Sequence, residues 1–399
     1  MTIKASGPLS FDNDIETEFG ENPSRSLGSY RNTHPDFKNK NCGSLTDLPL
    51  DEGIPKSGEI KFSDFYGKKL NIVVDYYSVS ENRQTSGASS MAATARYVSN
   101  NAKVKIVGDY QTKPTAILNP GTYNLTNATT NTSWQGGKKV FINVNAQIGG
   151  IKSINQADRN RVALRTGGWP SGTTLQIDIG PSGRLQGAGG DGRKGGGSTP
   201  AKALPGTSAL GVEYAAHINK SGIIRCGYGG GGGGGGSSSN PGKSKTDYGR
   251  SAGAGGGGAG IPAGNGGSQG TGGYGGSVGY GQAGQNGTKD AGGNAGPFTP
   301  PHGDQAAGGF GVGADHGGNS SGGVKAGNGG NGGDINDPVA TGGTNGVNQG
   351  GGTFAAAGGA GGNNGFGIIF GNASIEAACT GFKSTPNNEG GDTASGGIY

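Results

Sequence analysis

The chain has 399 residues, of which 93 are glycine and only 30% are hydrophobic, so only part of it can build an ordinary apolar core. The net charge of +5 does not come from the glycine-rich part, because five basic residues stand against six aspartates between Cys226 and Gly371. This balance argues against a basic nucleic-acid-binding surface in that part of the chain.

Residues 1–70 are predicted to be irregular, with turn-forming residues between spaced apolar side chains. Six of these side chains are candidates for attachment to a larger assembly: Phe11, Ile15, Phe19, Tyr30, Phe62 and Phe65. Apolar side chains carried on loops often dock onto a partner. The alternative is an internal layer packed against the next part of the chain, and the residues alone leave both interpretations open.

Residues 71–186 are predicted to form a β-domain that serves as a stalk. Strands are expected at 70–77 and 104–107, and apolar residues alternate with polar ones over 140–148 and 175–179. A short helix is expected over Met91–Tyr97. The β-domain carries no readable signature of an oligomer, so a homotrimer remains an open alternative.

Residues 187–371 contain 69 of the glycines and keep a three-residue register in two places. Glycines recur every third residue from Gly264 to Gly279 and again from Gly327 to Gly333. Three residues per turn is the period of the polyproline II helix, which makes no hydrogen bonds within its own chain. Because glycine has no Cβ, such helices can lie close enough to bond to one another through their backbones.

The register therefore predicts a stack of polyglycine helices joined by turns, and the segment 264–279 would be a rod of about 50 Å. Collagen has the same glycine spacing but requires abundant proline, and prolines are few here. The other alternative is disorder, since so few large apolar residues bury little surface. The fold class predicted for the whole chain is mainly β with a polyglycine II region and few or no α-helices.

Strand-like sequence borders the glycine-rich region on both sides. Residues 206–227 are predicted to form a strand, a turn and a strand. Residues 366–379 are again strand-like and are expected to pair with the Ala209–Cys226 strands. The chain beyond, 372–399, is assigned to a C-terminal strand and tail.

Three interruptions of the glycine pattern are predicted to be loops between the rods, at Ser237–Arg250, Thr288–Gln305 and Asp334–Asn348. Each mixes charges with a few apolar groups, a composition suited to contacting a partner. Including two tyrosines of the register itself, the candidate contact residues are Lys243, Asp247, Tyr248, Tyr274, Tyr280, Phe298, His302, Asp304, Ile335 and Asp337. Simple connection between rods is the alternative role of each loop.

The glycine-rich region contains apparent catalytic motifs, but the residues around them do not match the structure that each motif requires. Gly242-Lys243-Ser244 ends like a P-loop, but Ser237 occupies the position of the required glycine. Two G-x-S-x-G matches follow no predicted strand, and the four histidines form no metal-ligand spacing. We therefore predict no enzyme activity, no cofactor and no metal site.

The three cysteines are widely spaced and odd in number, so no disulfide framework is expected. The N-terminus has no apolar stretch typical of a signal peptide, and no run of about 18 apolar residues occurs. We expect a soluble protein without membrane insertion, compatible with assembly in a reducing cytoplasm.

A family resemblance appears in several of these segments. Residues 3–11, 14–20, 26–31 and 53–70 resemble the start of many tail-associated structural proteins of bacteriophages. Residues 187–192 together with 206–236 resemble the glycine-rich tail-fibre and tail-tip adhesins of T4-like and marine phages, and residues 366–379 resemble the closing hairpin of that family. The resemblance covers most of the chain and is strongest over Gly206–Gly236.

The resemblance implies a virion protein assembled in the host cytoplasm. Its N-terminal part would attach to other tail or baseplate proteins. A sandwich of polyglycine helices would present loops to a host receptor, either an outer-membrane protein or a polysaccharide. A structural tail or baseplate protein without adhesive function is the main alternative. An RNA-binding low-complexity protein is a third, but Arg250 is the only arginine from Cys226 to Gly371.

Overall fold

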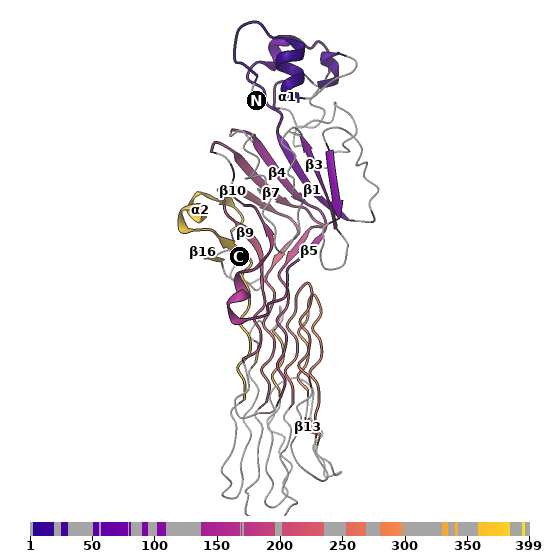
Figure 1. The fold of residues 1–399 in the computed structure, drawn as a ribbon, viewed down its shortest axis with the longest axis vertical. Coiled ribbons are helices and arrows are strands. Elements are labelled where there is room, and N and C mark those ends of the chain that lie inside the picture. Colours follow the sequence, from indigo (N-terminus) through magenta and orange to yellow (C-terminus); the bar gives the residue numbers. More distant parts are fainter. Residues whose placement is uncertain are drawn as a thin grey trace, which may run out of the picture.

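The computed structural model describes residues 3–19, 25–30, 51–55, 57–78, 80, 90–94, 102–108, 137–167, 169, 171–195, 202–234, 253–268, 280–296, 298–299, 329–333, 340–341, 358–383 and 393–395. Strands predominate in this part of the chain, and its few helices are short. The prediction of a mainly β chain with few helices is therefore confirmed. The strands lie between a small N-terminal region and a long extended region that is rich in glycine (Figure 1).

Parallel strands form three faces that recur in a fixed order along the chain. The first face contains β4 (Lys139–Val144), β7 (Thr174–Ile179), β10 (Ala216–Lys220) and β15 (Thr380–Gly381). The second contains β5 (Gln147–Gly149), β8 (Arg184–Gln186) and β11 (Ile223–Arg225). The third contains β6 (Val162–Arg165), β9 (Ser208–Val212), β14 (Ile368–Phe370) and β16 (Thr393–Ser395). The chain visits the faces in turn and then repeats the circuit, so these strands form a three-faced parallel solenoid.

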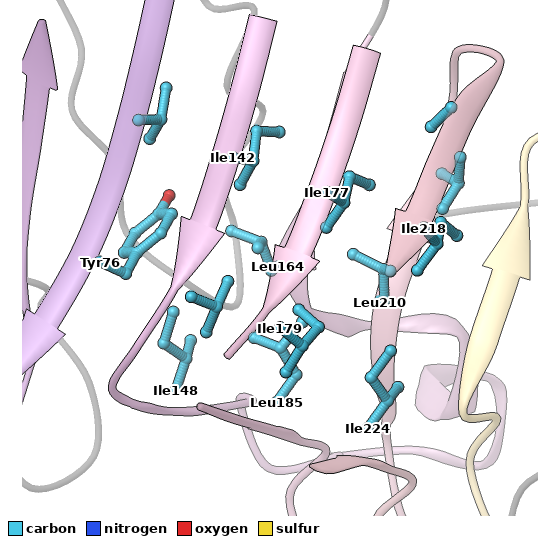
Figure 2. Close-up of a cluster of buried hydrophobic side chains, with 14 of the residues drawn as sticks. Tyr76, Ile142, Ile148, Leu164, Ile177, Ile179, Leu185, Leu210, Ile218 and Ile224 are labelled. Carbon is cyan, nitrogen blue, oxygen red and sulfur yellow. The ribbon is translucent and has the colours of Figure 1, made fainter. Parts of the chain in front are cut away.

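The core of the solenoid consists of stacked apolar side chains, one stack for each face (Figure 2). In the paired registers the three stacks are Ile142–Ile177–Ile218, Ile148–Leu185–Ile224 and Leu164–Leu210–Ile368. All of these side chains are buried. Alternation along each strand directs them inward while their neighbours face outward, which is the pattern that the sequence shows at 140–148 and 175–179.

The first face continues into strands from earlier in the chain. Strand β1 (Ile72–Ser78) pairs parallel with β4 and antiparallel with β3 (Ala102–Gly108), which confirms the two strands expected here. Strand β2 (Ser90–Thr94) pairs antiparallel with β3, so the helix expected over Met91–Tyr97 is wrong. The cross-strand hydrogen bonds of this pair outweigh the weak local preference for a helix.

The N-terminal residues build a small core of their own. Its short helical turns are η1 (Phe11–Glu16), α1 (Thr17–Phe19), η2 (Leu27–Tyr30) and η4 (Phe62–Phe65). Ile15, Phe19, Tyr30 and Phe65 are each 0% exposed and belong to one cluster, in which the Tyr30 and Phe65 rings meet edge to face. These four attachment candidates are internal, but they are buried against one another in a core of their own rather than as a layer against the next part of the chain. Phe11 is partly buried and packs against the cluster, and Phe62 is 42% exposed.

The segments that border the glycine-rich region join the solenoid. Residues 206–227 contain not two strands but three, β9, β10 and β11, and each lies on a different face. Strand β14 pairs with β9, as expected, although the pairing is parallel. The strand-like prediction is wrong beyond it, because α2 (Ala373–Ala378) forms there. The Asn372 side chain caps this helix by accepting from the N–H of Ile375 at 2.9 Å.

The glycine-rich residues leave the solenoid at a single corner. The chain between the second and third faces is short in the first circuit, 150–161, and contains η7 (Gln156–Asn160). In the next two circuits it spans 187–207 and 226–367, so strands from both sides of the boundary predicted at residue 186 share sheets. The longest excursion also contains the two-stranded ladder of β12 (Tyr280–Gly281) and β13 (Phe298–Thr299).

Candidate functional site

The extended region below the solenoid in Figure 1 consists of chain segments that lie side by side. We call its described residues the glycine bundle; they are 187–195, 202–207, 226–234, 253–268, 280–296, 329–333 and 358–367. Most of them belong to neither helix nor strand. Their backbone groups nevertheless bond to those of neighbouring segments at ordinary distances.

In one segment of the bundle, Gly253–Ile261, consecutive backbone N–H groups from Ala254 onwards donate to different neighbouring segments. The neighbouring segment that accepts from its N–H groups recurs every third residue. Ala254, Gly257 and Gly260 donate to residues 282–288, and Gly255, Gly258 and Ile261 donate to residues 187–193. Gly256 and Ala259 donate to residues 329–333. The donor–acceptor distances are 2.8 to 3.1 Å. An α-helix would bond within itself, and a β-strand would alternate between two neighbours.

The carbonyl groups of the same segment accept from three further neighbours. Tyr228, Gly231 and Gly234 donate to Ala259, Gly256 and Gly253; Gly264 and Gly267 donate to Gly258 and Gly255; and Gly293 and Gly296 donate to Gly257 and Ala254. The segment 253–261 is thus hydrogen-bonded to neighbours on every side. This network satisfies backbone groups that would otherwise be buried without partners.

Close packing of backbones makes glycine necessary at the centre of the bundle. A Cβ placed on Gly256 would overlap the carbonyl oxygen of Gly293, and one on Gly231 would overlap that of Gly330. Backbone atoms cannot move aside without breaking hydrogen bonds. Ala259 is tolerated in the same segment, where it packs with Cys226 and Tyr228 in a small buried cluster.

The pairing between β8 and β11 continues from the solenoid into the bundle with the same alignment. Gln186 pairs with Arg225 at the ends of β8 and β11. The N–H of Gly187 then donates to Arg225 at 3.0 Å, that of Gly190 to Tyr228 at 2.8 Å, and that of Arg193 to Gly231 at 3.1 Å. The two chains therefore keep the same alignment as they change from strand pairing to a three-residue repeat.

The segments of the bundle alternate in direction, away from the solenoid and back towards it. Described residues stop at Gly234, Ser268 and Thr299 and resume at Gly253, Tyr280, Gly329 and Gly358, and all of these positions lie away from the solenoid. We call this side of the bundle the remote end.

A turn at Thr288–Ala291 lies at the opposite, solenoid end of the bundle. The N–H of Thr288 donates to the carbonyl of Ala291 at 2.7 Å, and the Thr288 hydroxyl accepts from the N–H of Ala291 at 2.9 Å. The loop predicted over Thr288–Gln305 is therefore confirmed at residues 288–291, which turn the chain between two segments of the bundle. It is wrong for residues 292–296, which form a bundle segment because Gly293 and Gly296 donate to Gly257 and Ala254.

Polar side chains on the outer surface of the second face hold this turn; we call the contact the Asp290 clamp. The Asp290 carboxylate accepts from Arg184 of β8 and, at 2.9 Å, from Nη1 of Arg225 of β11. Gln186 donates to the carbonyl of Lys289 at 2.7 Å. Both arginine side chains are largely buried, at 10% and 9% exposure, whereas that of Asp290 is 48% exposed.

The arginines also set the charge state of the clamp. Partial burial alone would raise the pKa of Asp290. The hydrogen bond and charge of Arg184, together with the charges of Lys289 and Arg225, outweigh this effect and hold the pKa below its usual range. Asp290 therefore stays ionised at neutral pH, and the clamp contributes stability that is lost only as the pH falls through this lowered pKa.

Two of the predicted contact residues come together in the structure. Tyr280 pairs with Thr299, and Gly281 pairs with Phe298, in the β12–β13 ladder on the remote side of the bundle. The other contact candidates lie outside the described residues: Lys243, Asp247, Tyr248, Tyr274, His302, Asp304, Ile335 and Asp337.

The described residues that flank these candidates divide them into two groups. Those in 235–252, 269–279 and 300–328 are flanked by positions at the remote end. Ile335 and Asp337 are instead flanked by Gly333, which accepts from Ala259 near the solenoid.

The clamp itself was missed by sequence reasoning. Its only signal is a pair of charged residues, Lys289 and Asp290, isolated in a glycine-rich stretch. Nothing in the sequence pairs Asp290 with arginines more than 60 positions away.

Among the described residues, no group of three or more His, Cys, Asp or Glu side chains is placed to hold a metal ion. In the same part of the chain, no helix has the length and apolar character needed to cross a membrane. Comparison with known proteins finds no matching family model, no matching curated protein and no matching solved structure.

Proposed function

We propose that the glycine bundle is a polyglycine II sandwich and that it forms the receptor-binding part of a bacteriophage tail fibre or tail tip. The observation that carries this proposal is the threefold alternation of hydrogen-bond partners along Gly253–Ile261. In a helix with three residues per turn, each N–H points a third of a revolution away from the preceding one. Successive residues then reach three different neighbours, as they do in this segment.

A bundle of this kind suits recognition because its framework is ordered before a receptor arrives. A rigid framework loses less conformational entropy on binding than a flexible one, so more of the contact energy appears as affinity. In this proposal the contact residues are those that the sequence predicts between Lys243 and Asp304, among them Tyr280 and Phe298 of the β12–β13 ladder. A receptor protein or polysaccharide on the host surface is the partner that their mixed charge and aromatic character fits.

The opposite part of the chain supplies attachment to the virion in this proposal. The solenoid is a rigid spacer, and the N-terminal core folds as a compact cap packed next to β1 (Figure 1). Phe62 is one of the exposed large apolar side chains of the described residues, and it contacts Phe11 edge to face with ring centroids 6.5 Å apart. These two residues, rather than the four buried ones, are the attachment candidates that can touch a tail or baseplate protein.

Phage adsorption tests the proposal directly. Virions carrying Tyr280→Ala together with Phe298→Ala and His302→Ala should assemble with a normal content of the protein and adsorb to host cells about tenfold more slowly, the loss expected when one or two aromatic contacts disappear. The exposed Asn265→Ala variant is the matched control for a substitution within the bundle.

Two results would count against this function. If virions that carry the natural gene do not contain the protein, it is not a tail protein. Normal adsorption by the triple variant and by a variant with residues 300–328 replaced by a glycine–serine linker would support a structural tail or baseplate protein without adhesive function.

A further inference from the structure

The glycine spacing of the hairpin of residues 282–296 does little to fix its position along the axis of the bundle. Glycine recurs every third residue from Gly281, which directly precedes the hairpin, to Gly284 and Gly287 within it, and a glutamine follows each of the first two glycines, at Gln282 and Gln285. Gly284 and Gly287 both pack against the carbonyls of the segment 253–261. A slip by three residues towards the solenoid would therefore keep glycine at these two sites, although it would bring Ala295 to the place of Gly292, which packs against the carbonyl of Gly332.

Covalent continuity with the solenoid fixes the alignment of the segments that follow β8 and β11 but not of this hairpin. Residues 187–193 and 226–234 continue directly from β8 and β11. The hairpin continues directly from neither strand, because residues 226–281 lie between β11 and its first residue. Its only side-chain contacts with the strands of the second face are those of the Asp290 clamp, as far as the described residues show.

We propose that the Asp290 clamp sets the axial register of the hairpin 282–296. Asp290 is bonded to one arginine from each of two successive circuits of the solenoid, Arg184 and Arg225. Arg184 also donates to Gln186 at 2.7 Å, so its guanidinium is held in place before the turn docks. A slip by three residues would move the turn about 9 Å along the bundle and break every bond of the clamp.

This register has a consequence that rests on the proposed function. Tyr280 and Phe298 adjoin the two ends of this hairpin, and their ladder would move with it. Asp290 would then be a positioning residue for receptor contacts that are made at the other end of the bundle, without touching the receptor.

Disulfide trapping tests the register. The N–H of Ala295 lies 2.8 Å from Oδ1 of Asn331, so Ala295→Cys with Asn331→Cys reports the native alignment of the hairpin against segment 329–333. Asn331→Cys with Thr341→Cys is the reference pair, because the N–H of Asn331 donates to the Thr341 hydroxyl at 2.7 Å and neither residue belongs to the hairpin. Both pairs are compared in the full chain with and without Asp290→Ala.

The expected result is a yield of the 295–331 disulfide that falls to about half with Asp290→Ala, because without the hydrogen bonds to Arg184 and Arg225 the native and slipped registers have similar stability. The 331–341 disulfide should keep its yield, and Asp290→Glu should restore part of the 295–331 yield. Hydrogen exchange should remain slow at Gly284, Gln285 and Gly287, because a slipped hairpin is still hydrogen-bonded.

Two outcomes would overturn the proposal. An unchanged 295–331 yield in both Asp290→Ala and an Arg184→Ala/Arg225→Ala variant would mean that the register is set elsewhere. Fast hydrogen exchange throughout residues 282–288 of the Asp290→Ala variant would mean that the clamp keeps the hairpin folded and does not set its register. If the register changes as expected but adsorption does not, the register proposal stands and the receptor-binding function fails.

Discussion

A Gly256→Val substitution is expected to destabilise the glycine bundle by about 3 kcal/mol, the upper range for overpacking a well-packed interior. Gly256 donates to Gly330 and accepts from Gly231, and its Cβ would overlap the Gly293 carbonyl. Neither neighbour can retreat without losing its own hydrogen bonds. Calorimetry of the full chain should show a lower melting temperature for the transition of the bundle, with little change in that of the solenoid.

Asn265→Val is the matched control for this substitution. Asn265 lies in a neighbouring part of the bundle, but its side chain is exposed, so the new methyl groups meet solvent. Its melting temperature should stay close to that of the natural chain. If the Gly256→Val chain has the same melting temperature as this control, the segments are not packed backbone against backbone.

Lys138→Met is expected to cost about 3 kcal/mol, because it removes the ammonium group that faces a buried carboxylate. Nζ of Lys138 lies 3.3 Å from Oε1 of Glu18, and the two side chains are 4% and 1% exposed. The same oxygen accepts from the N–H of Leu70 at 2.8 Å. The contact joins the N-terminal core to the start of the solenoid, so its loss should lower the melting temperature of the N-terminal part.

The pH dependence of this loss has a definite sign. Burial is the largest influence on Glu18 and raises its pKa, while Lys138 and the Leu70 N–H act in the opposite direction. A raised pKa means that the fold prefers the protonated carboxyl, so stability is highest below the unfolded pKa and falls as the pH rises through the folded one. Without Lys138 the pKa rises further, and the deficit of Lys138→Met should be smaller at acidic pH than at pH 7.

The double variant Glu18→Gln/Lys138→Met separates charge from packing. Glutamine keeps an oxygen for the Leu70 N–H but carries no charge, so the double variant should recover much of the stability lost by Lys138→Met alone. A double variant as unstable as the single one would attribute the loss to the missing lysine chain. A Lys138→Met chain as stable as the natural one would contradict the buried ion pair itself.

The sequence is sufficient to predict the strands that alternate cleanly and the region in which glycine recurs every third residue. Ile142 and Ile177 sit in strands with regular inward and outward positions, and such patterns are local. The winding of the chain around three faces is not local. The second-face strands are three residues long, and β14 meets β9 across the whole glycine-rich excursion, so no short window contains the signal.

Other features depended on tertiary contacts that spacing does not reveal. The strand-like residues after Phe370 form α2, because Asn372 caps a short run of helix-forming alanines. Phe19 and Phe65 are apolar residues in irregular segments, and only their packing distinguishes a local core from a docking surface. The Asp290 clamp likewise joins residues that the sequence presents as unrelated.

Hydrogen exchange at the amides of Gly229–Gly234 and Gly253–Ile261 tests the central claim, that backbone bonds between glycine segments make an ordered platform. These residues belong to no helix or strand, yet most of them donate to a neighbouring segment. Exchange is expected to be at least about a thousandfold slower than in an unfolded peptide and comparable to that of the strands β4 and β7. Exchange at the rate of an unfolded peptide, with β4 and β7 still protected, would contradict it.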